Sequence, residues 1–205
     1  MKLNFIYKLQ CYLVITLQFF YTYGQNEVSQ GPYEQLILRG VTLINGNGAP
    51  PIGPVDIEIK KNIITKVQVV GYPGVSKKRN GPKLEKNGVE LDYTGMFVLP
   101  GFIDMHGHIG GVSQGADPEY VFNLWMAHGI TTIREPSGRG LNFTLDLKRK
   151  SAKNSIIAPR IYSYTGFGSG AEINNKEDAI KWVRDNAKNG ADGIKFFGAN
   201  PEILK

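Results

Sequence analysis

Two histidines, His106 and His108, stand at the end of the apolar run VLPGFIDMHGHIGG, and the whole chain contains three histidines. Side chains two residues apart on a strand point to the same side, so both imidazoles can reach one ion. Neutral imidazole is a common metal ligand. The spacing therefore fits a metal site, although histidines that are exposed or bonded within a core would also explain it.

Lys195 is the second residue with chemical potential, and it lies in the apolar segment GADGIKFFG. Burial or a nearby cation lowers the pKa of a lysine from its usual value of about 10.4. A neutral amine can add carbon dioxide to give a carbamate, an anionic ligand able to bridge two metal ions. The alternative is a lysine that extends from the strand end to solvent, and the spacing alone favours this alternative.

The segment from Gln35 to about Leu99 shows short apolar or alternating runs divided by turn signals such as NGNG and PP. This rhythm predicts a small domain of antiparallel strands, including a hairpin-like pair around Thr94-Gly95. Residues 71–90 carry five Lys or Arg, but Tyr72 is their only aromatic residue. That composition favours a solvated loop over a nucleic-acid-binding patch.

Beyond Pro100 the chain alternates strands with helices. The expected strands are 101–108, 130–134, 160–165 and 193–197, and the expected helices are 117–128, 141–154 and 176–189. Units repeated about every 30 residues predict a parallel sheet, either half of an eight-stranded barrel or part of an open doubly wound sheet. In both architectures active sites lie at the carboxyl ends of the strands, where His106 and His108 are expected.

Residues 1–24 have the pattern of a signal peptide. Lys2 and Lys8 precede an apolar stretch, residues 9–23, and small residues precede a possible cleavage site before Gln25. The stretch is shorter than the roughly 20 apolar residues that a membrane span needs. We therefore expect export to the periplasm or the extracellular space, with no stable membrane anchor after cleavage. The only cysteine, Cys11, would leave with this segment.

Three motifs, PGFIDMHGH, AHGITTIREPSG and GADGIKFFGANPEIL, resemble the metal-dependent amidohydrolase superfamily in order and spacing. The preceding RGVTLINGNGAPPIGPVDIEIKKNIITKV is similar to the opening sandwich of its imidazolonepropionase-like and prolidase-like members. The resemblance implies an α/β fold, in which a small β-sandwich domain over residues 25–99 precedes the first half of a (β/α)8 TIM-like barrel over residues 100–205.

The resemblance also implies a site. His106 and His108 match the histidine pair that binds the more buried metal, and Lys195 matches the carbamylated lysine that bridges two divalent ions, usually zinc. The implied activity is hydrolysis of a carbon–nitrogen bond of a small molecule (an amide, a cyclic amide or a dipeptide) by metal-activated water. The family's remaining ligands and its acid/base aspartate have no match up to Lys205. We therefore expect a fragment or truncated chain that is inactive by itself.

Two other functions stay open. One is a deaminase or imidazolone-type hydrolase of the same superfamily, with one metal and no carbamate. The other is a non-catalytic exported binding protein. The sequence leaves the substrate, the metal and the oligomeric state undetermined.

Overall fold

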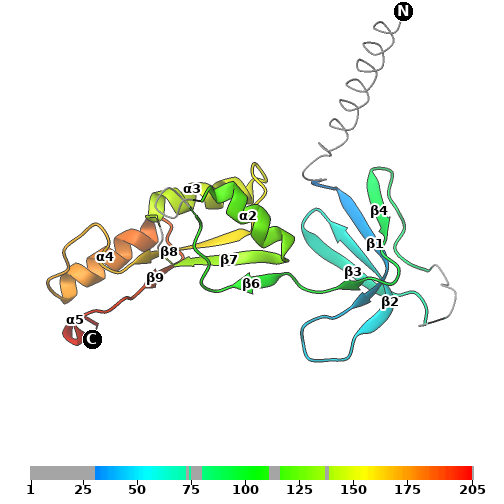
Figure 1. The fold of residues 1–205 in the computed structure, drawn as a ribbon, viewed down its shortest axis with the longest axis horizontal. Helices are drawn as coiled ribbons and strands as arrows, with labels where there is room; N and C mark the ends of the chain where they lie inside the picture. Colours follow the sequence, from blue (N-terminus) through cyan, green and yellow to red (C-terminus); the bar gives the residue numbers. More distant parts are fainter. Residues whose placement is uncertain (1–30, 73, 75–79, 111–115, 137–138, 205) are drawn as a thin grey trace, which may run out of the picture. The chain divides into compact units, whose positions relative to one another are not determined.

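The computed structural model describes residues 31–72, 74, 80–110, 116–136 and 139–204 (Figure 1). The predicted signal peptide lies outside these residues. The strands are β1 (Gln35–Leu43), β2 (Ile52–Lys60), β3 (Ile63–Val69), β4 (Gly88–Asp92), β5 (Phe97–Val98), β6 (Phe102–Asp104), β7 (Ile130–Pro136), β8 (Arg160–Gly166) and β9 (Gly193–Lys195), and the helices are α2 (Pro118–Ala127), α3 (Leu141–Ala152), α4 (Lys176–Lys188) and α5 (Pro201–Leu204).

The first five strands form one mixed sheet in the order β3-β2-β1-β4, with β5 also paired to β1. The β1–β2 and β2–β3 pairs are antiparallel, as the turn signals predict. Val41, Val55 and Ile57 form the buried centre of this sheet. The described residues of this region contain no second sheet packed on the first, so the expected sandwich stays a prediction.

The expectation of a hairpin around Thr94-Gly95 is wrong. Strands β4 and β5 do not pair with each other; both run parallel to β1, one along its first half and one along its end. The backbone of β1 breaks register between Leu38 and Val41, and Gly40 there has a φ of 68°. The tight turn after Asp92 therefore carries the chain past this bulge and along the same edge of β1.

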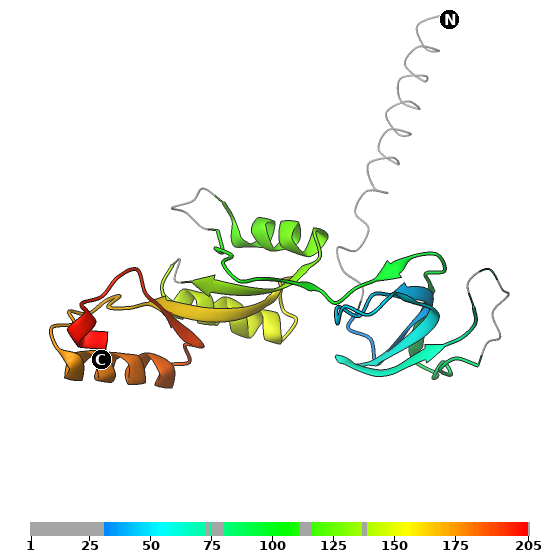
Figure 2. The same cartoon turned by 90° about the horizontal axis from the view of Figure 1, so that it is seen from below.

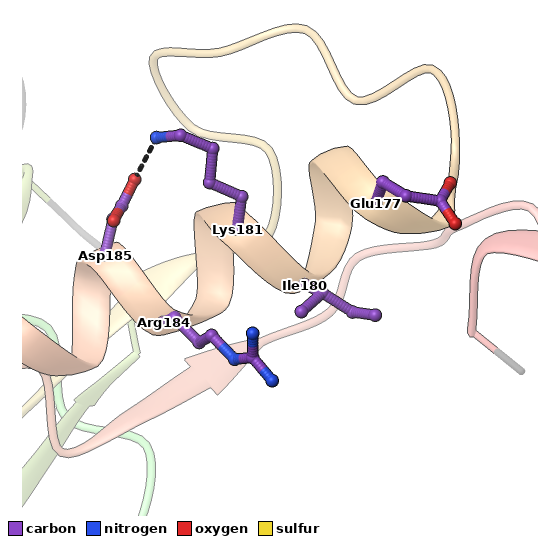
Figure 3. A pocket seen from close by; sticks show the side chains of 5 residues that line it. All are labelled: Glu177, Ile180, Lys181, Arg184 and Asp185. Carbon is purple, nitrogen blue, oxygen red and sulfur yellow. Dashed lines mark hydrogen bonds and ion pairs between the residues drawn. The ribbon is translucent and has the colours of Figure 1, made fainter.

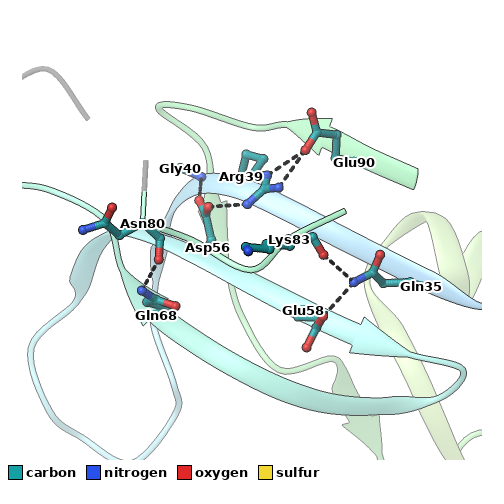
Figure 4. Close-up of polar contacts among 9 residues, drawn as sticks. All are labelled: Gln35, Arg39, Gly40, Asp56, Glu58, Gln68, Asn80, Lys83 and Glu90. Carbon is teal, nitrogen blue, oxygen red and sulfur yellow. Dashed lines mark hydrogen bonds and ion pairs between the residues drawn. The ribbon is translucent and has the colours of Figure 1, made fainter. Parts of the chain in front are cut away.

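A network of polar side chains crosses this sheet (Figure 4). Asp56, which is 4% exposed, accepts hydrogen bonds from Arg39 Nη1 at 2.7 Å and from the Gly40 backbone at 2.9 Å. Burial alone would lower the pKa of Arg39, but its hydrogen bonds to Asp56 and Glu90 outweigh this effect and hold the pKa above its usual value. The buried Gln35 side chain donates to Glu58 and to the Lys83 carbonyl. The described end of the predicted loop is thus fastened to β1.

Strands β6, β7, β8 and β9 form a second, fully parallel sheet in chain order, and each adjacent pair is joined through a helical segment or loop (Figure 2). This arrangement confirms the predicted mixed α/β organisation with a curled, half-barrel sheet. Its core is a cluster of Ile109, Phe122, Ile133 and Ile161, packed against partly buried side chains of α2 and α3. These contacts attach the helices to one face of the sheet.

Helices α2 and α4 begin within one residue of the expected positions, and each has a side-chain cap. Asp117 accepts a hydrogen bond from the Glu119 N–H, and Asn175 accepts one from the Asp178 N–H. On α4, Ala179 and Trp182 are buried, whereas Ile180 is 40% exposed. The Trp182 indole donates to the Ser169 carbonyl, and this contact turns the helix toward the loop after β8. None of the described helices has the length and apolar character required to cross a membrane.

Candidate functional site

His106 and His108 come directly after β6, which ends at Asp104. The strand expected to extend through His108 is therefore too long. Asp104 ends it because its Oδ1 accepts a hydrogen bond from the His106 backbone at 2.8 Å, which forms a turn. The structure nevertheless brings the two imidazoles together: their ring centroids are 5.2 Å apart, with an interplanar angle of 69°.

The loop that carries His108 is attached to the end of β7 on both sides of the histidine. The Gly107 N–H donates to the Arg134 carbonyl at 3.2 Å, and the Ile109 N–H donates to Glu135 Oε2 at 2.5 Å. Ile109 is 1% exposed within the core of the parallel sheet. These three contacts fix the backbone of the histidine loop against the sheet.

Glu135 also contacts the His108 ring, with 3.2 Å between Glu135 Oε1 and His108 Nδ1. The Glu135 side chain is 1% exposed, whereas that of His108 is 40% exposed. The imidazole therefore has one nitrogen against a buried carboxylate, while its ring remains accessible. The sequence predicted a strand over residues 130–134, directly before Glu135, but it gave no sign of this contact with His108.

Lys195 ends β9, opposite Gly166 in the register of β8. Its side chain is half-buried, and its Nζ lies 5.3 Å from the centroid of the Phe197 ring. Lys195, His106 and His108 all lie toward the carboxyl ends of parallel strands, but β9 and β6 are the two outer strands of the sheet. Within the described chain, Lys195 contacts an aromatic ring rather than the histidines, and its carbamylation stays a prediction.

Between these two positions, Arg134 and Tyr164 occupy one face of the sheet. The Arg134 guanidinium lies 5.1 Å from the centroid of the Tyr164 ring. The Nε of Arg134 is buried and has no hydrogen-bond partner among the described residues. Thr165, the next residue of β8, is 5% exposed and faces the other way from Tyr164.

The third histidine has a separate role. His128 caps the carboxyl end of α2, and its Nδ1 lies 2.7 Å from the Leu124 carbonyl oxygen. This agrees with its predicted place at a helix end. A shallow hollow on α4, lined by Glu177, Ile180, Lys181, Arg184 and Asp185, is also separate from the histidines (Figure 3). Its Lys181 and Asp185 side chains pair with each other.

The two histidines can serve as two ligands of one metal ion, because both rings are exposed and near each other. The described residues include no group of three or more His, Cys, Asp or Glu side chains that could hold a metal. Ordinary zinc sites have three or four protein ligands. The two histidines therefore supply part of such a ligand set.

No family model matches the chain. Solved structures share its fold: a Xaa-Pro dipeptidase with bound methionine in its active site (TM-score 0.54, 23% identity, covering 79% of this chain and 46% of that one) and molinate hydrolase (TM-score 0.62, 16% identity, covering 82% and 45%). At these identities the likeness establishes the fold alone.

Adenine deaminase of Ligilactobacillus salivarius is 34% identical over 105 residues, which are 45% of this chain and 18% of the enzyme. Adenine deaminase 2 of Desulfotalea psychrophila is 34% identical over 98 residues. Adenine deaminases are amidohydrolase-superfamily enzymes. The chain is related to the amidohydrolase superfamily. This relationship confirms the resemblance of the sequence motifs. The chain spans less than half the length of these superfamily relatives.

Proposed function

We propose that the chain contributes to the active site of a metal-dependent amidohydrolase that cleaves carbon–nitrogen bonds. The observation that carries the proposal is the His106–His108 pair, whose rings lie 5.2 Å apart after the first strand of the parallel sheet. That is the end of the sheet where parallel α/β folds hold their active sites. The relationship to adenine deaminases and the fold shared with a dipeptidase support a hydrolase of this class.

In this proposal His106 and His108 bind a divalent metal ion, zinc, through their exposed imidazoles. A metal bound there would polarise the carbonyl of the substrate and lower the pKa of a water molecule toward neutrality. Lys195, as a carbamate, would supply an anionic ligand from the outer strand β9. Further ligands and the acid/base carboxylate come from outside the described residues, within a (β/α)8 barrel preceded by a β-sandwich.

The substrate class we favour is a small amide, cyclic amide or dipeptide, in line with the dipeptidase fold. A second candidate is deamination with one metal and no carbamate, because the sequence relatives are adenine deaminases. Lys195 separates the two. Its Nζ lies 5.3 Å from the centroid of the Phe197 ring in the described structure, and carbamylation would replace the cation that this ring attracts by an anion.

The test uses the protein expressed from its complete gene. We expect hydrolysis of a panel of Xaa-Pro dipeptides and cyclic amides, lost with a chelator and restored by zinc. Lys195→Ala should abolish this activity, with partial restoration by bicarbonate and short carboxylic acids. Adenine deamination that survives Lys195→Ala would instead support the single-metal alternative. Binding of small molecules without turnover in every assay would contradict both and support a binding protein.

A further inference from the structure

We propose that Glu135 is a positioning residue: it holds His108 in the tautomer that carries its proton on Nδ1 and so presents Nε2 as a metal ligand. The part of this proposal that concerns metal rests on the proposed function. The part that concerns the tautomer rests on the geometry of the three residues His108, Ile109 and Glu135 alone.

The two oxygens of Glu135 are directed to two neighbours in the histidine loop. Oε2 lies 2.5 Å from the Ile109 backbone nitrogen, and Oε1 lies 3.2 Å from His108 Nδ1. The backbone N–H can only donate, so Oε2 must accept. A carboxylate offers acceptors alone, so Oε1 is satisfied when His108 Nδ1 carries the proton.

This choice leaves the lone pair of His108 on Nε2. Metal-bound histidines commonly donate their other ring N–H to a carboxylate or a carbonyl, which fixes both the tautomer and the ring orientation. Glu135 is suited to that task because it is 1% exposed and therefore shielded from competing water. The Gly107–Arg134 and Ile109–Glu135 hydrogen bonds hold the loop on both sides, so the ring and the carboxylate keep their separation.

The substitution Glu135→Gln distinguishes a role of Glu135 in positioning His108 from a role in structural support alone. Glutamine has one acceptor oxygen and one donor NH2 group at this end. The Ile109 N–H needs the oxygen, which places the NH2 group against His108 Nδ1. That nitrogen must then accept, and the proton moves to Nε2. The substitution thus preserves the shape of the side chain but is expected to reverse the tautomer and block the metal-binding nitrogen.

The experiment is long-range ¹⁵N–¹H NMR of the histidine rings in the full 205-residue chain, without metal and at pH 8.5, where ordinary imidazoles are neutral. The chain has three histidines, so single His→Gln substitutions assign them. His128 is an internal standard for the Nδ1–H tautomer, because its Nδ1 lies 2.7 Å from a carbonyl oxygen that can only accept. Glu34→Gln, on an exposed acid, is the matched control.

We expect His108 to show the Nδ1–H pattern in the wild-type chain and in Glu34→Gln, and the Nε2–H pattern in Glu135→Gln. An Nε2–H pattern in the wild-type chain would overturn the proposal even if the glutamine variant failed to fold. An unchanged Nδ1–H pattern in folded Glu135→Gln would also overturn it.

A zinc titration of the same variants, in the protein expressed from its complete gene, connects the tautomer to metal. Loss of a carboxylate partner of this kind commonly weakens metal affinity by about 10–100-fold, and we expect a loss in this range for Glu135→Gln and none for Glu34→Gln. Equal zinc affinity in Glu135→Gln and the wild type would overturn the metal part of the proposal. If the wild-type chain shows the Nδ1–H tautomer but His108 does not contact zinc in the protein from the complete gene, the proposed function fails while the positioning role stands.

Discussion

The ring of Tyr164 on β8 lies directly over Gly193 on β9, so that a Cβ built on Gly193 would come within 2.7 Å of three ring atoms. The two residues are register partners in the parallel sheet. The Arg134 guanidinium packs on the same ring. The Tyr164 ring, which lies between the histidine loop and Lys195, thus approaches the backbone so closely that position 193 requires glycine.

Gly193→Ala should destabilise the chain by about 1–3 kcal/mol, because the added methyl group displaces the Tyr164 ring from a packed position. Chemical denaturation monitored by circular dichroism measures the loss. In a Tyr164→Ala background the same substitution should be neutral or slightly stabilising, since alanine suits a strand better than glycine does. An equal loss in both backgrounds would show that the ring is not the cause.

Asp56→Asn should destabilise the five-stranded sheet by about 1–3 kcal/mol, because it places an amide NH2 group against the half-buried Arg39 guanidinium. The Asp56 and Arg39 side chains are 5% and 18% exposed. The matched control is Asp185→Asn, which breaks the exposed Lys181–Asp185 pair on α4 and should leave the denaturation midpoint unchanged. Equal midpoints for the two variants would contradict the structural role of Asp56.

Glu58 should make the stability of the same sheet depend on acid pH. Hydrogen bonds from Thr65 and then Gln35 lower the pKa of Glu58. A carboxylate whose pKa is lower in the folded than in the unfolded state binds fewer protons when the protein is folded. Its contribution to the free energy of unfolding is therefore present above the unfolded pKa of about 4.3 and is lost as the pH falls below that value. Glu58→Gln should flatten this part of the curve of unfolding free energy against pH. A curve of unchanged steepness would count against the effect.

We also propose that the protein is exported and loses residues 1–24. Mass spectrometry of protein purified from its native source should find a chain that begins at or near Gln25, because cleavage is expected after the small residue Gly24. The same protein should be enriched in the periplasmic or extracellular fraction. Intact Met1 on protein from a cytosolic fraction would refute export.

The sequence predicted the alternation of strands and helices after Pro100 because β-branched strands and capped amphipathic helices carry local signals. In the structure, Asp117 and Asn175 cap the helices α2 and α4 through their side chains. Local signals did not reveal that β4 and β5 share one edge of β1, because that pairing depends on a bulge at Gly40 in a distant strand.

The candidate site was predictable in part for the same reason. The histidine pair is visible as a motif, whereas its support by Glu135 depends on a contact between residues 27 positions apart. Strand β6 ends at Asp104 because the side chain of Asp104 accepts a hydrogen bond from the His106 N–H, so the strand is a few residues shorter than expected. The position of Lys195 against Phe197 likewise follows from packing at the strand end, which periodicity does not encode.

The most direct test of the central claim, that His106 and His108 bind a catalytic metal, is X-ray absorption spectroscopy of the zinc-loaded protein expressed from its complete gene. We expect scattering from at least two imidazoles at Zn–N distances of about 2.0–2.1 Å. The scattering should fall by about two imidazoles in the His106→Ala/His108→Ala double variant and stay unchanged in His128→Ala, whose ring bonds a helix carbonyl. Full imidazole scattering in the double variant would contradict the claim.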